Sequence, residues 1–419
     1  MVWMSAALGM PLPLLMRAVH ASGFQLGLLS SAWQFAMLAQ LPSALIVEKL
    51  SRRKPLWAVV SILHRALWAT PAVLPFLLPE RRDLWPMVIV LALATSNVLG
   101  QAGTGPWQSW MADLLPPSRA GRFWGRRQRI QSTMMVLGAF VFGWLLDTYS
   151  GSSGNFLGFQ LVFGLAGIFG VSDVLIHCAV TEPALRPHPH DEPLWGRIIR
   201  PFRNPDFLVL TIGMGIWTGS QAMAGYTLGS AGFFSMDYVK EAFGATYSQA
   251  SWIFIASGVS AVLWTPRIGH WMDHVGAGAV LQRLVVYAPL PMLGWLFVAK
   301  TRWTLWGSDP IPAAVVLMCL CSLVSGGLYA GAYLCQIRLT QACTNPEGRT
   351  LAMAVHWSTS GFIASLGPLA AGWIKDHLAG RTLPPWYPGG APVSYYQLLV
   401  ALHLVLAWAV ALPLLRRIK

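Results

Sequence analysis

Two charged side chains stand inside apolar segments of the sequence. Arg65 and Asp173 each interrupt a run of residues long enough to cross a bilayer as a helix. Because a charge in hydrocarbon is costly, each marks a functional residue or a buried ion pair. At 1.5 Å per helical residue both lie roughly 12–14 Å inside their segments. The matching depths predict an Arg65–Asp173 ion pair; the alternative is that Arg65 attracts an anionic substrate or that Asp173 carries protons.

Amide, hydroxyl and aromatic side chains recur at helical spacing in three other apolar segments. Separations of four and seven residues place such side chains on one face of a helix. Stripes of this kind on opposed helices could clamp a neutral or amphipathic solute, whereas the structural alternative is hydrogen bonding between packed helices. The predicted cavity residues are Asn97, Gln101, Thr104, Trp217, Gln221, Tyr329 and Tyr333.

Sequence signatures of enzyme chemistry are missing. There is no HExxH, GxSxG or Walker-type lysine motif. The 5 cysteines lack the spacing of a zinc site and indicate free thiols. The sequence therefore predicts a protein that is not an enzyme and that holds neither a metal nor another cofactor.

The composition indicates a protein embedded in a lipid bilayer. Of 419 residues, 55% are hydrophobic and only 11% are charged, against about 25% charged in a soluble domain. The mean hydropathy is +0.53, and the 21 tryptophans suit the membrane–water interface. A net charge of +13 is explained by basic loops on one side of the membrane, so no nucleic-acid partner is expected.

Apolar segments of spanning length recur along the whole chain, and Pro11 and Pro13 are expected to kink or unwind the first of them. Twelve spans are predicted, at residues 1–16, 24–47, 56–78, 84–111, 130–147, 157–180, 207–232, 249–271, 280–299, 311–337, 351–374 and 395–415. Most Lys and Arg residues fall in the loops that follow even-numbered spans, which predicts that both termini are cytoplasmic.

The loop at residues 181–206 is rich in Pro, His and charge, and it divides the chain into two halves. We expect a bundle of six helices at 1–180, a cytoplasmic linker at 181–206 and a second bundle at 207–419. The halves repeat each other: GAFVFGWLLD (138–147) and GPLAAGWIKD (367–376) both read G-x4-G-W-x-x-D. Ordered matches of this kind indicate a duplicated unit, as transporters commonly show.

A second repeat lies at the inner ends of the second and eighth spans, in ALIVEKLSRRK and GHWMDHVGAG. Its predicted gating residues are Glu48, Lys49, Arg52 and Arg53 in the first copy and Gly269, Asp273, His274 and Gly276 in the second. An acid at a helix end can pair with a basic loop residue, and glycines permit tight turns and close helix approach. We therefore expect the first copy to supply charge contacts and the second to supply close packing. The alternative is a topological signal in which basic residues only mark the inner side.

On these residues the chain resembles the major facilitator superfamily, whose loop signature is G-x-L-x-D-R-x-G-R-R. The resemblance implies an all-α membrane protein with twelve transmembrane helices in two pseudo-symmetric six-helix bundles. It also implies that the first, fourth, seventh and tenth helices line the central cavity and that the inner loops form a latch. The expected latch partners are Asp113, Arg119, Arg122, Arg338 and Arg349. A basic side chain from the inner loop around Arg338–Arg349 is the expected partner of Asp273.

The resulting hypothesis is a secondary transporter, or permease, that moves a small organic solute by rocker-switch alternating access. Efflux of amphipathic drugs or lipids is one alternative, and a transporter-fold sensor that binds a partner without transport is another. The expected partners are a small-molecule solute, a coupling ion and the lipid bilayer. No carboxylate is expected on a cavity-lining helix, so His64, His177, His356 and His403 are the candidates for proton coupling. We expect a monomeric, multi-pass protein of a bacterial plasma (inner) membrane.

Overall fold

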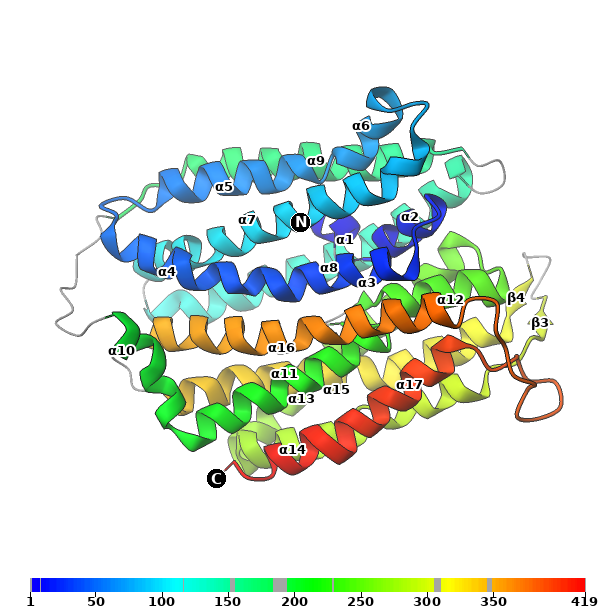
Figure 1. Ribbon diagram of the computed structural model, residues 1–419. Helices are drawn as coiled ribbons and strands as arrows, with labels where there is room; N and C mark the ends of the chain where they lie inside the picture. The colour runs from blue at the N-terminus through cyan, green and yellow to red at the C-terminus, as the bar shows by residue number, and fades with distance from the viewer. Residues whose placement is uncertain are drawn as a thin grey trace.

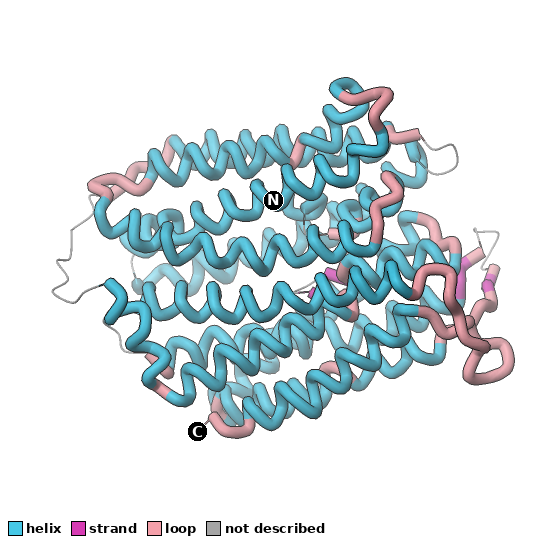
Figure 2. The backbone as a smooth tube through the Cα atoms, viewed as in Figure 1, coloured by secondary structure: helices cyan, strands magenta, loops and turns pink. Residues whose placement is uncertain are grey.

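The fold is an array of long helices that run roughly side by side, joined by short loops (Figures 1 and 2). This computed structural model describes residues 2–7, 9–115, 117–150, 155–183, 194–227, 230–304, 310–344 and 349–418. We call the end that carries α10 and the C-terminus the inner end, and the end that carries β3 and β4 the outer end (Figure 1).

The first part of the chain forms helices that meet within a few residues of one another. They are α1 (Val2–Ala7), α2 (Pro11–Ala18), α3 (Gly23–Phe35), η1 (Ala36–Ala39), α4 (Gln40–Lys49), α5 (Lys54–Leu67), α6 (Thr70–Leu77), η2 (Arg82–Leu84), α7 (Trp85–Leu114), α8 (Pro117–Ser150) and α9 (Leu157–Cys178). As expected from its prolines, the first apolar segment is broken, because a proline ring fits the first turn of a helix but disrupts an interior.

The second part is also helical and adds two short antiparallel strand pairs. Its elements are α10 (Leu194–Ile199), η3 (Arg200–Arg203), α11 (Pro205–Met223), β1 (Tyr226–Thr227), β2 (Ser230–Ala231), α12 (Phe233–Phe243), α13 (Tyr247–Val275), α14 (Ala277–Tyr287), η4 (Leu290–Phe297), β3 (Arg302–Trp303), β4 (Ile311–Pro312), α15 (Ala313–Ala342), α16 (Arg349–His377), α17 (Tyr395–Val405), η5 (Leu406–Ala411) and α18 (Leu412–Leu415). In the two pairs Tyr226 faces Ala231 and Arg302 faces Pro312.

Among the described residues, 6 helices are long and apolar enough to cross a membrane, or 7 if the bent pair α5–α6 is one span. The two helices of that pair meet at 55°. The segment predicted as one span at 207–232 is instead α11 followed by a turn at Gly225, whose φ of +85° favours glycine, and then the β1–β2 hairpin. Large apolar side chains such as Phe76 and Ile176 are more than two-thirds exposed, at 78% and 72%, as expected for a surface that faces lipid.

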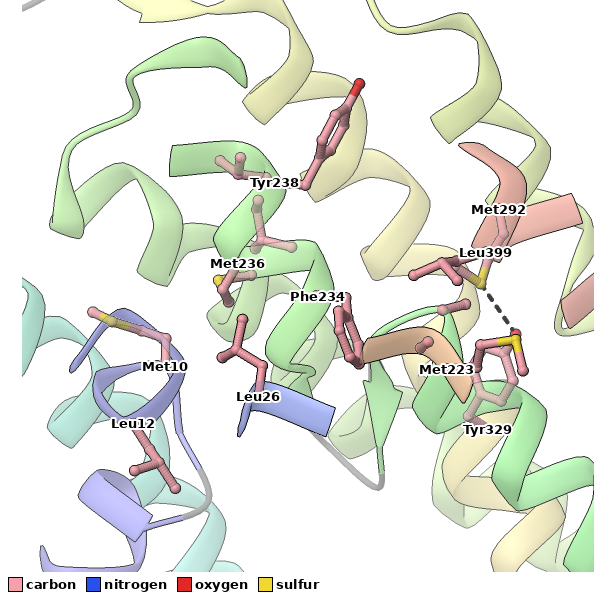
Figure 3. Close-up of a cluster of buried hydrophobic side chains, with 14 of the residues drawn as sticks. Met10, Leu12, Leu26, Met223, Phe234, Met236, Tyr238, Met292, Tyr329 and Leu399 are labelled. Carbon is pink, nitrogen blue, oxygen red and sulfur yellow. Dashed lines mark hydrogen bonds between the residues drawn. The ribbon is translucent and has the colours of Figure 1, made fainter. Parts of the chain in front are cut away.

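Helices from the two parts of the chain lie directly against each other. α16 packs along α3, and α13 packs along α8 (Figure 1). Near the outer end, α12 packs against α2 and α3. Figure 3 shows the buried cluster at this contact, with Met10 and Leu26 from the first part near Phe234 and Met236 from the second. The apolar core therefore continues from one part of the chain into the other.

Candidate transport pathway

The two copies of the G-x4-G-W-x-x-D repeat end at the same kind of contact. Asp376, near the end of α16, accepts hydrogen bonds from the backbone N–H groups of Gly23 and Phe24 at 2.6 and 2.7 Å. Asp147, near the end of α8, accepts hydrogen bonds from Tyr247 and Ser248 at 2.7 and 2.8 Å. Each carboxylate thus caps the first two N–H groups of a helix, α3 or α13, from the other part of the chain.

These helix starts are favourable places for a carboxylate. The first N–H groups of a helix have no partner within it, and its dipole favours negative charge at that end. Ser22 and Thr246 precede the two helices and each forms a capping box with a glutamine three residues later. The local caps use the third N–H group, so Asp376 and Asp147 satisfy the first and second. The pseudo-symmetric capping couples the outer ends of the two parts of the chain.

A buried ion cluster lies at the same outer end. Asp237 on α12 is 1% exposed and lies 3.0 Å from the guanidinium of Arg17 on α2. Lys375 on α16 also pairs with Asp237, and the Tyr395 hydroxyl donates to it at 2.9 Å. Because α2 belongs to the first part of the chain and the other three elements to the second, this cluster also joins the two parts.

At the inner end, Arg53 is the centre of a network within the first part of the chain. Its side chain is completely buried, and its guanidinium lies 2.6 Å from the Asp113 carboxylate and 2.7 Å from the Ser109 hydroxyl. Glu182 accepts a hydrogen bond from the Arg53 backbone N–H at 2.5 Å and lies 3.6 Å from its guanidinium. Arg53 thus connects the loop before α5 to α7 and to the segment after α9. A basic residue that only marked the inner side of the membrane would not need these buried contacts.

The second copy of the gating motif is more exposed. Arg338 lies 3.5 Å from Asp273, and both side chains are 62% exposed. Gly276 has a φ of +90° and makes the turn before α14. A Cβ atom at Gly269 or Gly276 would meet nothing within 4 Å, so the expectation that these glycines supply close packing is wrong. The ring of His274 contacts that of His270, with centroids 4.2 Å apart.

Arg52 and five other predicted gating or latch residues differ from Arg53 in how the structure describes them. Arg52 is exposed beside the buried Arg53. The remaining side chains lie outside the described part of the structure: Glu48, Lys49, Arg119, Arg122 and Arg349. Among pairs of described residues, the ion pairs that join the two parts of the chain are those of Arg17 with Asp237 and Glu241, at the outer end.

The predicted cavity residues line two different cavities. Those of α11 and α15 surround a narrow space of about 20 Å³ together with Gln34 and Met37 from the first part of the chain. That volume is close to the room that one water needs. The four predicted residues at this central cavity are Trp217, Gln221, Tyr329 and Tyr333.

Histidines from neighbouring helices hold the polar groups around the central cavity. His403 is hydrogen-bonded to the Tyr329 hydroxyl at 2.8 Å and to the Ser220 hydroxyl at 2.9 Å. His356 is hydrogen-bonded to Gln336 at 2.9 Å and to Thr211 at 2.8 Å. Both histidines are fully buried. Both histidines therefore form hydrogen bonds between helices, which is the structural role that polar residues commonly have in membrane bundles.

The predicted residues of α7 line a larger cavity, of about 270 Å³, inside the first part of the chain. Asn97, Gln101 and Thr104 face it, as do Arg65 and Asp173. Arg65 and Asp173 share this cavity but form no ion pair with each other, so the predicted direct pairing is wrong. The guanidinium of Arg65 instead lies over the Trp3 ring, 3.4 Å from its centroid, while the Asp173 carboxylate lies 3.8 Å from His177.

Arg17, Asp237 and Lys375 are site residues that the sequence reasoning missed. Each lies near the end of an apolar segment, where charged residues are common and do not by themselves indicate a site. The sequence signal for the outer-end contacts is the acid that ends both copies of G-x4-G-W-x-x-D. An acid kept at the same position of both copies indicates a polar contact and not apolar packing. Its partners are backbone N–H groups, which no sequence motif marks.

Long apolar helices, contacts that join two repeated units and cavities among polar stripes define a multi-pass integral membrane protein with a transporter fold. The family model described as Major Facilitator Superfamily matches residues 1–368. The chain belongs to this superfamily, whose structural neighbours here are transporters and not enzymes. No curated protein sequence matches the chain significantly.

Solved structures similar to the chain are also transporters. The nucleoside transporter NupG matches with a TM-score of 0.63 and 14% identity, with 100% of each chain covered. A bacterial homologue of the human lysosomal transporter Spinster, inward-facing, matches with a TM-score of 0.62 and 18% identity over 99% of this chain and 96% of that one. FucP, in the outward conformation, matches with a TM-score of 0.59 and 16% identity over 100% and 96%. At these identities the likeness shows the fold alone.

Proposed function

We propose that the chain is a secondary transporter that moves a small organic solute by rocking its two halves, 1–180 and 207–419, against each other. In this proposal the chain crosses a bacterial inner membrane twelve times as a monomer, with both termini and the 181–206 linker in the cytoplasm. The observation that carries it is the paired closure of the outer ends by Asp147 and Asp376. Each cap joins the end of a helix in one half to the start of a helix in the other, so the two caps lie where a rocking motion would separate the halves.

The outer closure indicates which state the structure represents. Arg17, Asp237 and Lys375 seal the outer end, and the described ion pairs at the inner end, such as that of Arg53 with Asp113, stay within one half. This distribution supports an outer-closed state in the rocking cycle. In the opposite state the outer contacts would separate and the inner ends would approach, with the gating motif acting as the latch.

Solute counterflow in proteoliposomes tests the proposal. Because similar structures include nucleoside and D-xylose transporters, the panel begins with a nucleoside, a pentose, an amino acid and an aromatic carboxylate. Transport predicts that unlabelled solute inside the vesicles drives uptake of the labelled solute. A panel member that shifts the melting temperature of the protein but is not exchanged would identify a binding protein instead and contradict the proposal.

The predicted topology has a separate test. A fluorescent protein that folds only in the cytoplasm is fused to the C-terminus, and fluorescence is expected. A dark fusion with normal protein levels would contradict the cytoplasmic assignment and reverse the inner and outer ends.

A further inference from the structure

The 270 Å³ cavity of the first half holds an arginine that the fold does not neutralise. Within the described part of the chain, Arg65 forms no ion pair, and its buried Nε–H has no hydrogen-bond partner. Its guanidinium lies over the Trp3 ring, which offers cation–π attraction but no negative charge. A cation at this depth in a membrane helix is costly and is ordinarily paired.

No described carboxylate on the cavity wall is in contact with this arginine. Asp173 lines the same space, but its carboxylate lies 3.8 Å from His177 and forms no ion pair with Arg65. Of the two histidines there, His64 is hydrogen-bonded through Nδ1 to Ser96 at 2.7 Å, and His177 through Nδ1 to the Asp173 carbonyl at 3.1 Å. The Arg65 guanidinium therefore faces the cavity without an anionic partner among the described residues.

The remaining wall suits an apolar body with a polar end. Trp33, Trp57 and Trp107 line the cavity in addition to Trp3. The Asn97 side-chain oxygen is buried there without a hydrogen-bond partner, so it can accept a hydrogen bond from a donor group on the body of a ligand. At 1.5 Å per residue, the wall of α7 from Asn97 to Trp107 extends about 15 Å along the helix.

Two glycines on α7 are needed for this geometry. A Cβ atom at Gly100 would lie 2.9 Å from the His64 ring, and one at Gly103 would lie 3.2 Å from the Ser61 hydroxyl. Both glycines let α7 approach α5, the helix that carries Arg65, closely enough for the two to share a cavity wall. The sequence thus keeps the arginine on the wall of a cavity that is also lined by tryptophans.

We propose that this cavity binds a small organic anion, with its acidic group on Arg65 and its apolar body between the tryptophans. A carboxylate or phosphate group would give Arg65 an anionic partner through charge-assisted hydrogen bonds to the guanidinium. That the cavity binds an anion does not depend on the proposed function. That this anion is the transported solute rests on the proposed function. Binding and exchange are therefore measured separately.

The first experiment compares 1-naphthoate with 1-naphthamide, which has the same ring but no charge, by quenching of tryptophan fluorescence in nanodiscs. We expect naphthoate to bind the wild-type protein at least about tenfold more tightly than naphthamide. Equal affinity for the two would overturn the proposal without any variant, so misfolding cannot obscure this result. Naphthoate that binds but is not exchanged in counterflow would contradict only the transport step.

The second experiment uses variants with opposite expected signs. Arg65→Gln should weaken naphthoate binding about 10- to 100-fold, and Arg65→Lys should restore part of it. Asp173→Asn removes a negative charge from the cavity wall, which repels an anionic ligand, and should tighten binding roughly 3- to 10-fold. Arg81→Gln, in an exposed outer loop, is the matched control and should have no effect. Weaker binding in Asp173→Asn, or unchanged binding in a folded Arg65→Gln protein, would refute the assignment.

A third arm identifies the natural source of the anionic group. Nanodiscs are prepared with and without phosphatidylglycerol. If naphthoate binds equally in both, the occupant is a soluble organic anion. If phosphatidylglycerol competes in the wild-type protein but not in Arg65→Gln, the acidic group comes from a lipid headgroup. Competition that persists in Arg65→Gln would place the lipid elsewhere and count against the cavity as its site.

Discussion

Replacing both capping carboxylates at the outer end should shift the protein toward a state with that end open. In Asp147→Asn and Asp376→Asn the charge is lost, although one side-chain oxygen can still accept a hydrogen bond. Each carboxylate makes two bonds to a helix start, and the loss of charge there costs about 1 kcal/mol, or about fivefold in an equilibrium constant. The two acids share no partner, so their effects should add to about 2 kcal/mol, or roughly 30-fold.

The distance between the outer ends measures this shift. Spin labels are placed at the exposed positions Leu77 and Leu383, in a background whose native cysteines are replaced by alanine, and distances are measured by pulsed electron paramagnetic resonance. We expect each single variant to increase the population with a long distance and the double variant to increase it most.

The control variant removes a carboxylate that lies at the outer end but caps no helix of the other half. Arg81 donates side-chain hydrogen bonds to Asp83 at 3.2 and 3.3 Å, and both residues are exposed. Asp83→Asn should leave the distances unchanged. A double variant with wild-type distances, or an equal response in Asp83→Asn, would show that the caps do not hold the outer end closed.

Three further changes have defined outcomes. Arg53→Ala should lower the free energy of unfolding by about 3 kcal/mol, because it empties the space of a completely buried side chain and leaves the Asp113 and Glu182 carboxylates without their cation. The exposed Arg52→Ala should change it by less than about 0.5 kcal/mol, and similar unfolding midpoints for both variants would contradict the buried network. In Gly372→Ala the added Cβ atom would overlap the backbone of α3 and should increase the distance between the outer ends. In Gly269→Ala the added Cβ atom would meet nothing within 4 Å, so that distance should not change. Asp273→Asn removes an exposed ion pair and should change stability by less than about 1 kcal/mol, yet it should slow counterflow, and unchanged kinetics would exclude a latch role.

The local and periodic features of the fold could be predicted from the sequence. Apolar runs gave the long helices, and Pro11 and Pro13 gave the break between α1 and α2. The repeat marked Asp147 and Asp376 as equivalent positions before their contacts were known. Partner choice was harder: the equal depths of Arg65 and Asp173 suggested a pair, but depth along a helix does not fix the direction in which a side chain points.

From the sequence alone we predict a helical membrane chain with a repeated motif, because hydropathy, helical spacing and repeats are properties of contiguous residues. The packing of helices buries Arg53, places Asp147 and Asp376 at helix starts in the other part of the chain, and turns Arg65 toward a cavity without an acid in contact. Those facts depend on the rotation and approach of helices far apart in the chain. They also involve backbone N–H groups and a cavity, and the amino-acid types alone do not specify the position of either.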